Sequence, residues 1–132
     1  MTGRNASSTG YSLAFDYIHL VPTPRLETES LKVKAKTPVP TGISSAAWFG
    51  VFQSSAASAG AGTYLNATAV GNYITRTVPV AEAGTYRVRV GVQTKPNKGK
   101  FKLAINGVTQ GIAQDEYSPS VSYGVRIWVR FI

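Results

Sequence analysis

The chain has 132 residues, no cysteine and a formal net charge of +8 at neutral pH. The absence of cysteine excludes disulfides, thiolate metal sites and cysteine nucleophiles. Its hydrophobic content of 43% is ordinary for a globular protein, so we expect one folded domain over residues 1–132 with a real core.

The basic excess favours anionic partners, namely nucleic acid, anionic lipid or acidic polysaccharide, although solubility alone explains such an excess equally well. Basic residues are spread along the chain, with one concentration at Lys95, Lys98, Lys100 and Lys102. No apolar run approaches the roughly 18 residues that span a bilayer, so we expect no membrane insertion. Residues 1–20 also lack the pattern of a signal peptide.

Apolar residues recur with a period of two, which is typical of strands with one buried face. Turn signals separate these runs, and Asn106-Gly107 is the strongest, because a type I′ hairpin turn needs positive φ at both positions. Short strands at a spacing of about 8–12 residues predict an antiparallel β-sandwich without a long helix. The predicted strands are residues 11–20, 26–36, 63–68, 72–80, 85–93, 100–106, 108–112 and 124–131.

The first predicted strand, "YSLAFDYIHL", contains the only histidine, His19, which we do not expect to act in catalysis. Strict alternation gives the strand two faces, one with Leu13, Phe15, Tyr17 and His19 and the other with Ala14, Asp16, Ile18 and Leu20.

Two loops follow farther along the chain. The segment "SSAAWFGVFQSS" is predicted to be a loop, and its apolar composition is unusual for one, which points to an interface. Residues 56–62, rich in Gly, Ala and Ser, are also predicted to form a loop.

The last predicted strand, "VRIWVRF", also has two faces, and its apolar face consists of Val125, Ile127, Val129 and Phe131. Trp128 lies between two arginines on the opposite face, outside the expected core pattern. Such a tryptophan could stack on a sugar, lie beside a bound uronate or contact a neighbouring subunit, since Trp and Arg are both enriched at interface hot spots.

Several segments together resemble one family. The stretch "AGTYRVRVGVQTKPNKGKFKLAINGVTQGIAQDEYS" resembles the middle of a galactose-binding-like jelly roll, as in carbohydrate-binding modules of families six and thirty-five. "LETESL" resembles the first strand of that family, and "TYLNATAVGNYITRTVPV" resembles the segment after it. "TGRNASSTGYSLAFDYIHLVP" resembles its last hairpin.

The order of these segments differs from the family, because the D-Y-I segment precedes the E-x-E segment here. The chain therefore resembles a circularly permuted module, either engineered or cut as one unit from a tandem array. Termini of such sandwiches lie close together and cuts at exposed turns are tolerated. The region "SYGVRIWVRFI" is also shorter than its counterpart in the family, which leaves one sheet edge without a covering strand.

The resemblance implies a non-catalytic, extracellular module that binds a polysaccharide or oligosaccharide and holds a structural calcium ion. The matching calcium ligands are Asp16, Glu27 and Glu29. Glu27 and Glu29 are two residues apart and therefore project to one side of a strand, and Ca²⁺ binds six to eight oxygen ligands. The alternative is that both glutamates are solvated residues at a sheet edge.

Sugar recognition combines an aromatic face with polar side chains that bind hydroxyl groups. The candidate ligand-binding residues are Trp48, Tyr64, Tyr73, Asn97, Tyr117 and Trp128. For Trp48 and Trp128, ligand contact and a protein interface are equal alternatives.

No nucleophile elbow, Walker loop or zincin motif is present, so we expect no enzymatic activity. Nucleic acid is not the expected partner, because Lys100 and Lys102 alternate with apolar residues as on a solvated strand face. The second function that we consider is a self-assembling scaffold. It would form a homo-oligomer through an exposed strand edge together with Trp48 or Trp128.

Overall fold

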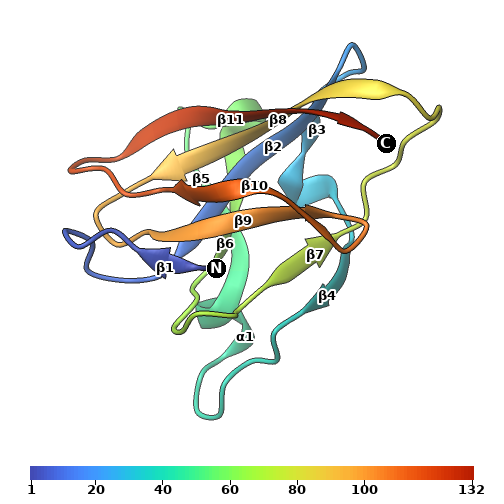
Figure 1. Ribbon diagram of the computed structural model, residues 1–132. Helices are drawn as coiled ribbons and strands as arrows, with labels where there is room; N and C mark the ends of the chain where they lie inside the picture. Colours follow the sequence, from blue (N-terminus) through green and yellow to red (C-terminus); the bar gives the residue numbers. More distant parts are fainter.

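The computed structural model describes residues 1–132 and shows an all-β chain with antiparallel sheets (Figure 1). One sheet has the strand order β11-β8-β2-β6-β5, with β3 paired to β2; a second has the order β1-β9-β10, and β4 pairs with β7. The strands are β1 (Gly3–Arg4), β2 (Leu13–Val21), β3 (Leu26–Glu27), β4 (Val33–Lys36), β5 (Phe49–Gln53), β6 (Ala61–Leu65), β7 (Ile74–Arg76), β8 (Thr85–Thr94), β9 (Gly99–Ile105), β10 (Val108–Asp115) and β11 (Ser122–Phe131).

The helical segments are one short helix and two 3₁₀ turns. They are α1 (Ser45–Trp48), η1 (Thr28–Ser30) and η2 (Ser58–Gly60).

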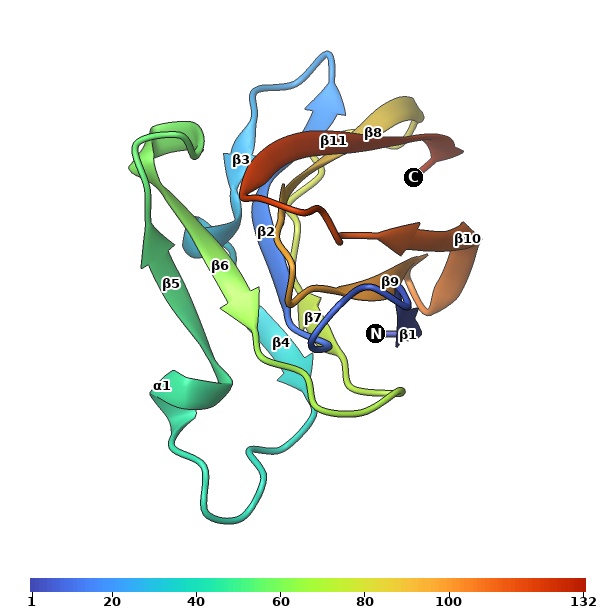
Figure 2. The same ribbon diagram turned by 90° about the vertical axis from the view of Figure 1, so that its left-hand side faces the viewer.

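The two larger sheets form the layers of an antiparallel β-sandwich, which confirms the fold class expected from the sequence (Figure 2). β1, β9 and β10 lie on one side of the larger sheet, opposite β2, β8 and β11. The core between these layers is apolar, and its buried residues include Leu13, Leu20, Val88, Val90, Val92, Phe101 and Trp128. We call the opposite side of the larger sheet, turned away from this core, the outer face.

Strand β2 lies in the middle of the larger sheet and is irregular. Its register with β8 shifts between Phe15 and Ile18, so that Phe15, Ile18 and Leu20 all contact the core side. Strict alternation was therefore wrong for the second half of this strand. Asp16 and Tyr17 both reach the outer face, where they line the same hollow.

The hairpin at Asn106-Gly107 is confirmed. Both residues have positive φ, 51° and 80°, and Ile105 pairs directly with Val108 across the turn. The type I′ geometry matches the right-handed twist of the strands that it joins.

Two predicted segments differ in the structure. The stretch 26–36 is not one strand but β3, η1 and β4, because the Thr28 side chain turns inward and its hydroxyl donates to the carbonyls of Phe15 and Asp16. The segment 49–53, predicted as a loop, is strand β5, which pairs along its whole length with β6.

Strand β11 buries the face that contains Trp128 and the two arginines, whereas its apolar pattern indicates that the other face is buried. Trp128 is 6% exposed, whereas Ile127 and Val129 are 56% and 58% exposed. The inward polar groups find partners on β10, since the Trp128 indole N–H donates to the Gln110 carbonyl and the Arg126 guanidinium donates to the Asp115 carbonyl. Burial of these side chains therefore leaves few polar groups without partners, and the apolar face remains exposed.

The face assignment predicts different stabilities for two neighbouring alanine variants. Trp128→Ala removes a large buried side chain and is expected to lower the free energy of unfolding by about 3–5 kcal/mol. Ile127→Ala removes an exposed side chain and is expected to change it by less than about 1 kcal/mol. Urea unfolding of both variants is the measurement, and the reverse order would contradict this orientation of β11.

Candidate functional site

Aromatic side chains on the outer face lie across glycines of neighbouring strands. The Tyr64 ring lies over Gly50, and its hydroxyl donates to the Ala46 carbonyl. The Phe52 ring lies over Gly62, where a Cβ atom would collide with the ring carbon Cζ. A side chain at either glycine would displace the ring, so the glycines allow both rings to lie against the sheet.

These two rings line a hollow on the outer face, which we call the Tyr64–Asn97 hollow. It has a volume of about 420 Å³. Residues from β5, β6, β8, β11 and nearby loops surround it, namely Ser12, Phe52, Gln53, Ser54, Tyr64, Asn66, Gln93, Lys95, Asn97, Lys98, Val121 and Tyr123. Aromatic rings, amides, hydroxyls and ammonium groups therefore surround one space.

Some polar groups of the Tyr64–Asn97 hollow are fixed by the protein and others are free. The Asn66 side chain bonds to the Ser12 hydroxyl and to the Ala47 carbonyl, and the Gln93 amide donates to the Tyr123 hydroxyl. The side chains of Asn97 and Lys95 have no hydrogen bond within the chain. The fixed groups hold the wall in shape, while the free ones can bind a ligand.

A buried pair of ionisable groups lies beside this hollow. Glu116 is fully buried and accepts the Ala14 N–H on Oε1, while its Oε2 has no partner. The buried Lys98 ammonium donates to the Ser12 hydroxyl at 3.2 Å. Burial raises the pKa of Glu116, although the Ala14 N–H and Lys98 oppose the shift, and burial lowers the pKa of Lys98.

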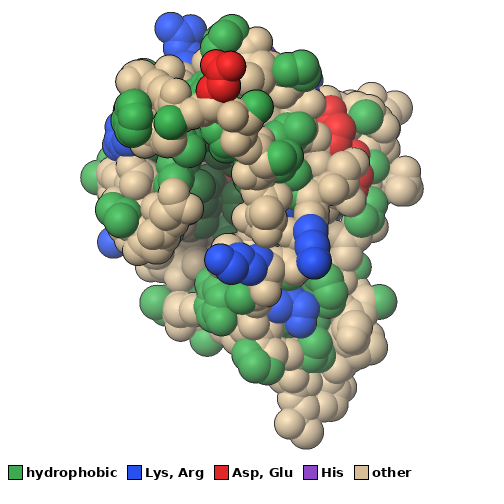
Figure 3. All heavy atoms as spheres, turned by 90° about the vertical axis from the view of Figure 1, so that its right-hand side faces the viewer, with side chains coloured by type: hydrophobic (Ala, Val, Ile, Leu, Met, Phe, Trp, Pro, Cys, Tyr) green, Lys and Arg blue, Asp and Glu red, His purple; other side chains and the backbone are tan.

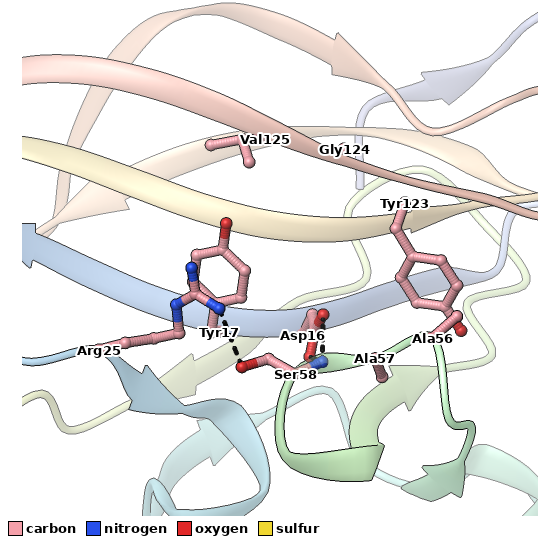
Figure 4. A pocket seen from close by; sticks show the side chains of 9 residues that line it. All are labelled: Asp16, Tyr17, Arg25, Ala56, Ala57, Ser58, Tyr123, Gly124 and Val125. Carbon is pink, nitrogen blue, oxygen red and sulfur yellow. Dashed lines mark hydrogen bonds between the residues drawn. The ribbon is translucent and has the colours of Figure 1, made fainter.

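The second hollow, which we call the Tyr17–Arg25 hollow, has a volume of about 310 Å³ and shares Tyr123 with the first. Figure 4 shows it between β11 and the loop that precedes β6. The Arg25 guanidinium lies 3.8 Å from the centre of the Tyr17 ring, and Arg25 also donates to the Ser58 hydroxyl. The Tyr17 ring covers Gly91, in the same manner as the two rings of the first hollow.

The three predicted calcium ligands occupy one neighbourhood at the edge of this hollow. The Asp16 carboxylate accepts the Ser58 N–H, and Glu27 Oε1 accepts the Ser58 hydroxyl. Glu27 Oε2 and Glu29 Oε2 are buried without partners. Burial, together with the negative charge of Glu27, raises the pKa of both Asp16 and Glu29. In this geometry no three His, Asp or Glu side chains are arranged to hold a metal ion.

The structure brings only part of the predicted ligand set together. Tyr64 and Asn97 line the same hollow, whereas Tyr73 and Tyr117 line neither. Trp48 and Trp128 are 1% and 6% exposed, so neither offers a stacking face or an interface surface, and both expectations are corrected. Trp48 is the last residue of α1, and its indole N–H donates to the Thr37 carbonyl, so the polar atom of the buried ring has a partner.

Several lining residues were missed by sequence reasoning. Phe52 was assigned to a loop, and Tyr123 lies just before the predicted start of the last strand. Glycines opposite aromatic residues in the two segments "WFGVFQ" and "AGAGTYL" were the available signal, but using it requires the register of β5 on β6.

The basic side chains do not form one continuous patch on the face seen in Figure 3, where Lys and Arg occur at several separate places among neutral residues. The structure also contains no helix with the length and apolar composition that crossing a bilayer requires.

Comparisons with protein-family models, with curated proteins and with solved structures found no match.

The buried Glu116 predicts a specific dependence of stability on pH. Because the pKa is raised from 4.5 to about 8, the folded state keeps a proton that the unfolded state releases in this interval. Wild-type stability should therefore fall as pH rises through it, by about 1.4 kcal/mol for each pH unit in which only the unfolded state is ionised.

Glu116→Gln removes this titration and should show a smaller decline with pH. Urea unfolding at a series of pH values measures the effect. Parallel pH profiles for the two proteins would show that Glu116 is ionised in the folded state.

Proposed function

We propose that this chain is a non-catalytic carbohydrate-binding module that holds a polysaccharide or oligosaccharide in the Tyr64–Asn97 hollow. The main support is that two aromatic rings, Tyr64 and Phe52, line the same hollow as the side chains of Asn97 and Lys95, which have no hydrogen bond within the chain. Sugars bind through the same combination, in which an aromatic face contacts C–H groups and polar side chains bind hydroxyls.

Acidic glycans are the ligands that the charges favour. Lys95 and Lys98 are the only charged residues in the lining of the Tyr64–Asn97 hollow. An ammonium group beside a carboxylate or sulfate forms a charge-assisted hydrogen bond, which is stronger than a neutral one. A uronate or a sulfated sugar would therefore bind better here than its neutral counterpart.

The lining of the hollows supports binding rather than hydrolysis. Glycoside hydrolysis generally uses two carboxyl groups on either side of the scissile bond. Among the residues that line the two hollows, only Asp16 has a carboxylate, and it accepts the Ser58 N–H.

Variants of the free polar side chains test the binding site. Asn97→Ala and Lys95→Ala should each weaken polysaccharide binding about tenfold, the effect of losing one hydrogen bond of about 1.4 kcal/mol. Affinity electrophoresis against neutral and acidic polysaccharides measures the change, and the loss in Lys95→Ala should be largest for acidic ones.

The matched controls are Lys34→Ala, which removes one charge from an exposed position on β4, and Tyr73→Ala, which removes an exposed aromatic ring outside the hollows. Both should bind like the wild type. Equal losses for Lys95→Ala and Lys34→Ala would show that only net charge matters, and no retardation on any polysaccharide would refute the function.

We also propose that Asp16, Glu27 and Glu29 hold a structural calcium ion. Two buried carboxylate oxygens without partners, Glu27 Oε2 and Glu29 Oε2, are groups that a cation would satisfy. Calcium prefers carboxylate and carbonyl oxygens, and its charge would favour the ionised forms of Asp16 and Glu29, whose pKa is raised by burial and by the charge of Glu27. Binding would compete with the bonds from Ser58 to Asp16 and Glu27.

Calcium should raise the midpoint of thermal unfolding and a chelator should reverse the rise, because a ligand of the folded state stabilises it by mass action. Glu29→Gln should have a higher midpoint than the wild type in chelator, since it removes a partly buried charge near Glu27. The same variant should respond less to calcium. A wild-type midpoint that is the same with calcium and with chelator would reject the site.

A further inference from the structure

One sheet edge is open along its whole length. Strand β11 pairs with β8 on one side and ends the six-stranded sheet on the other (Figure 1). It is ten residues long, and the carbonyls of Val125 and Val129 accept only from the guanidinium group of the next residue in each case. An unpaired strand edge of this length is a template for pairing with another strand.

The same strand has an exposed apolar row on the outer face. Val125, Ile127, Val129 and Phe131 alternate along it, and the last three are 56%, 58% and 74% exposed. Tyr123 continues the row at one end and separates the two hollows. An apolar row along an open edge gives a partner strand both backbone bonds and side-chain contacts.

We propose that β11 pairs antiparallel with β11 of a second copy of this chain, about a twofold axis at Ile127. This surface does not rest on the proposed carbohydrate binding. A twofold axis perpendicular to the sheet keeps the outer faces of both copies on one side. Odd-numbered residues then lie opposite odd-numbered ones, and even-numbered residues opposite even-numbered ones. The apolar rows of the two copies then become neighbours.

The positions of the arginines disfavour the two neighbouring registers. With the axis at Ile127, Val125 lies opposite Val129 of the second copy, and Tyr123 lies opposite Phe131. Shifting the axis to Trp128 would place Arg126 directly opposite Arg130, and shifting it to Arg126 would oppose Arg126 to itself. Like charges directly opposite are destabilising, whereas apolar and aromatic pairs are stabilising.

The remaining positive charges are compatible with this dimer. The Arg126 and Arg130 guanidinium groups also bond to Asp115 and Gln110 of β10 in their own copy, so they keep these partners when a second strand replaces their bonds to the Val125 and Val129 carbonyls. Arg87 and Arg89 on β8 would lie three strand spacings from their counterparts, about 14 Å at about 4.8 Å each. This exceeds the Debye length of about 8 Å at physiological ionic strength, so the residual repulsion is weak and association should strengthen with salt.

The sequence has no cysteine, so introduced thiols report the register directly. Ile127→Cys places its two thiols opposite each other at the axis and should form a disulfide-linked dimer under mild oxidation. Val129→Cys lies on the same face of the same strand, but its two copies would be four residues apart along the strands, about 13 Å, and should link far less. Mixing Val125→Cys with Val129→Cys should restore linkage.

Light scattering across protein concentration measures the association itself. The wild type should move from 14.1 kDa toward twice that mass as concentration rises, and more so at higher salt. Ile127→Lys should remain a monomer with an unchanged circular dichroism spectrum. A wild type that is monomeric at all concentrations would overturn the proposal, as would a dimer that links equally through Ile127→Cys and Ile112→Cys on β10.

Discussion

The register shift in strand β2 determines which side chains of the central strand face the core and which face outward. Its register with β8 shifts between Phe15 and Ile18, and the carbonyls freed by the shift accept from buried hydroxyls. Thr28 donates to Phe15 and Asp16, and Thr63 also donates to Phe15. A buried carbonyl without a partner costs about 1–3 kcal/mol, so the hydroxyls make the shifted register stable.

The register shift also shapes the outer face of the larger sheet. It puts two successive side chains, Asp16 and Tyr17, on the outer face without removing Ile18 from the core. Tyr17 covers Gly91 and supports Arg25, while Asp16 fixes the loop at Ser58. The hollows, the acidic cluster and the open edge of β11 thus share one sheet, in which β2 is the central strand.

Short sequence patterns predicted the strands and turns that depend only on residues next to one another in the chain. The period of two indicated most strands, and Asn106-Gly107 fixed a hairpin because its turn depends on those two residues alone. The shift in β2 could not be predicted, since it depends on threonines from η1 and β6. The buried face of β11 could not be predicted either, because it depends on the hydrogen bonds that Trp128 and Arg126 donate to carbonyls of β10. Of the predicted ligand-binding residues, only two line the same hollow.

Nuclear Overhauser contacts of the Tyr17 ring test the shifted register of β2 most directly. The shifted register predicts strong contacts between the Tyr17 ring protons and the Hα protons of Gly91, together with contacts from the Ile18 methyl groups to core residues. Contacts from the Tyr17 ring to Phe101 in the core, with Ile18 on the outer face, would mean that β2 alternates strictly. That result would contradict the register shift in β2, since Asp16 and Tyr17 could not then share the outer face.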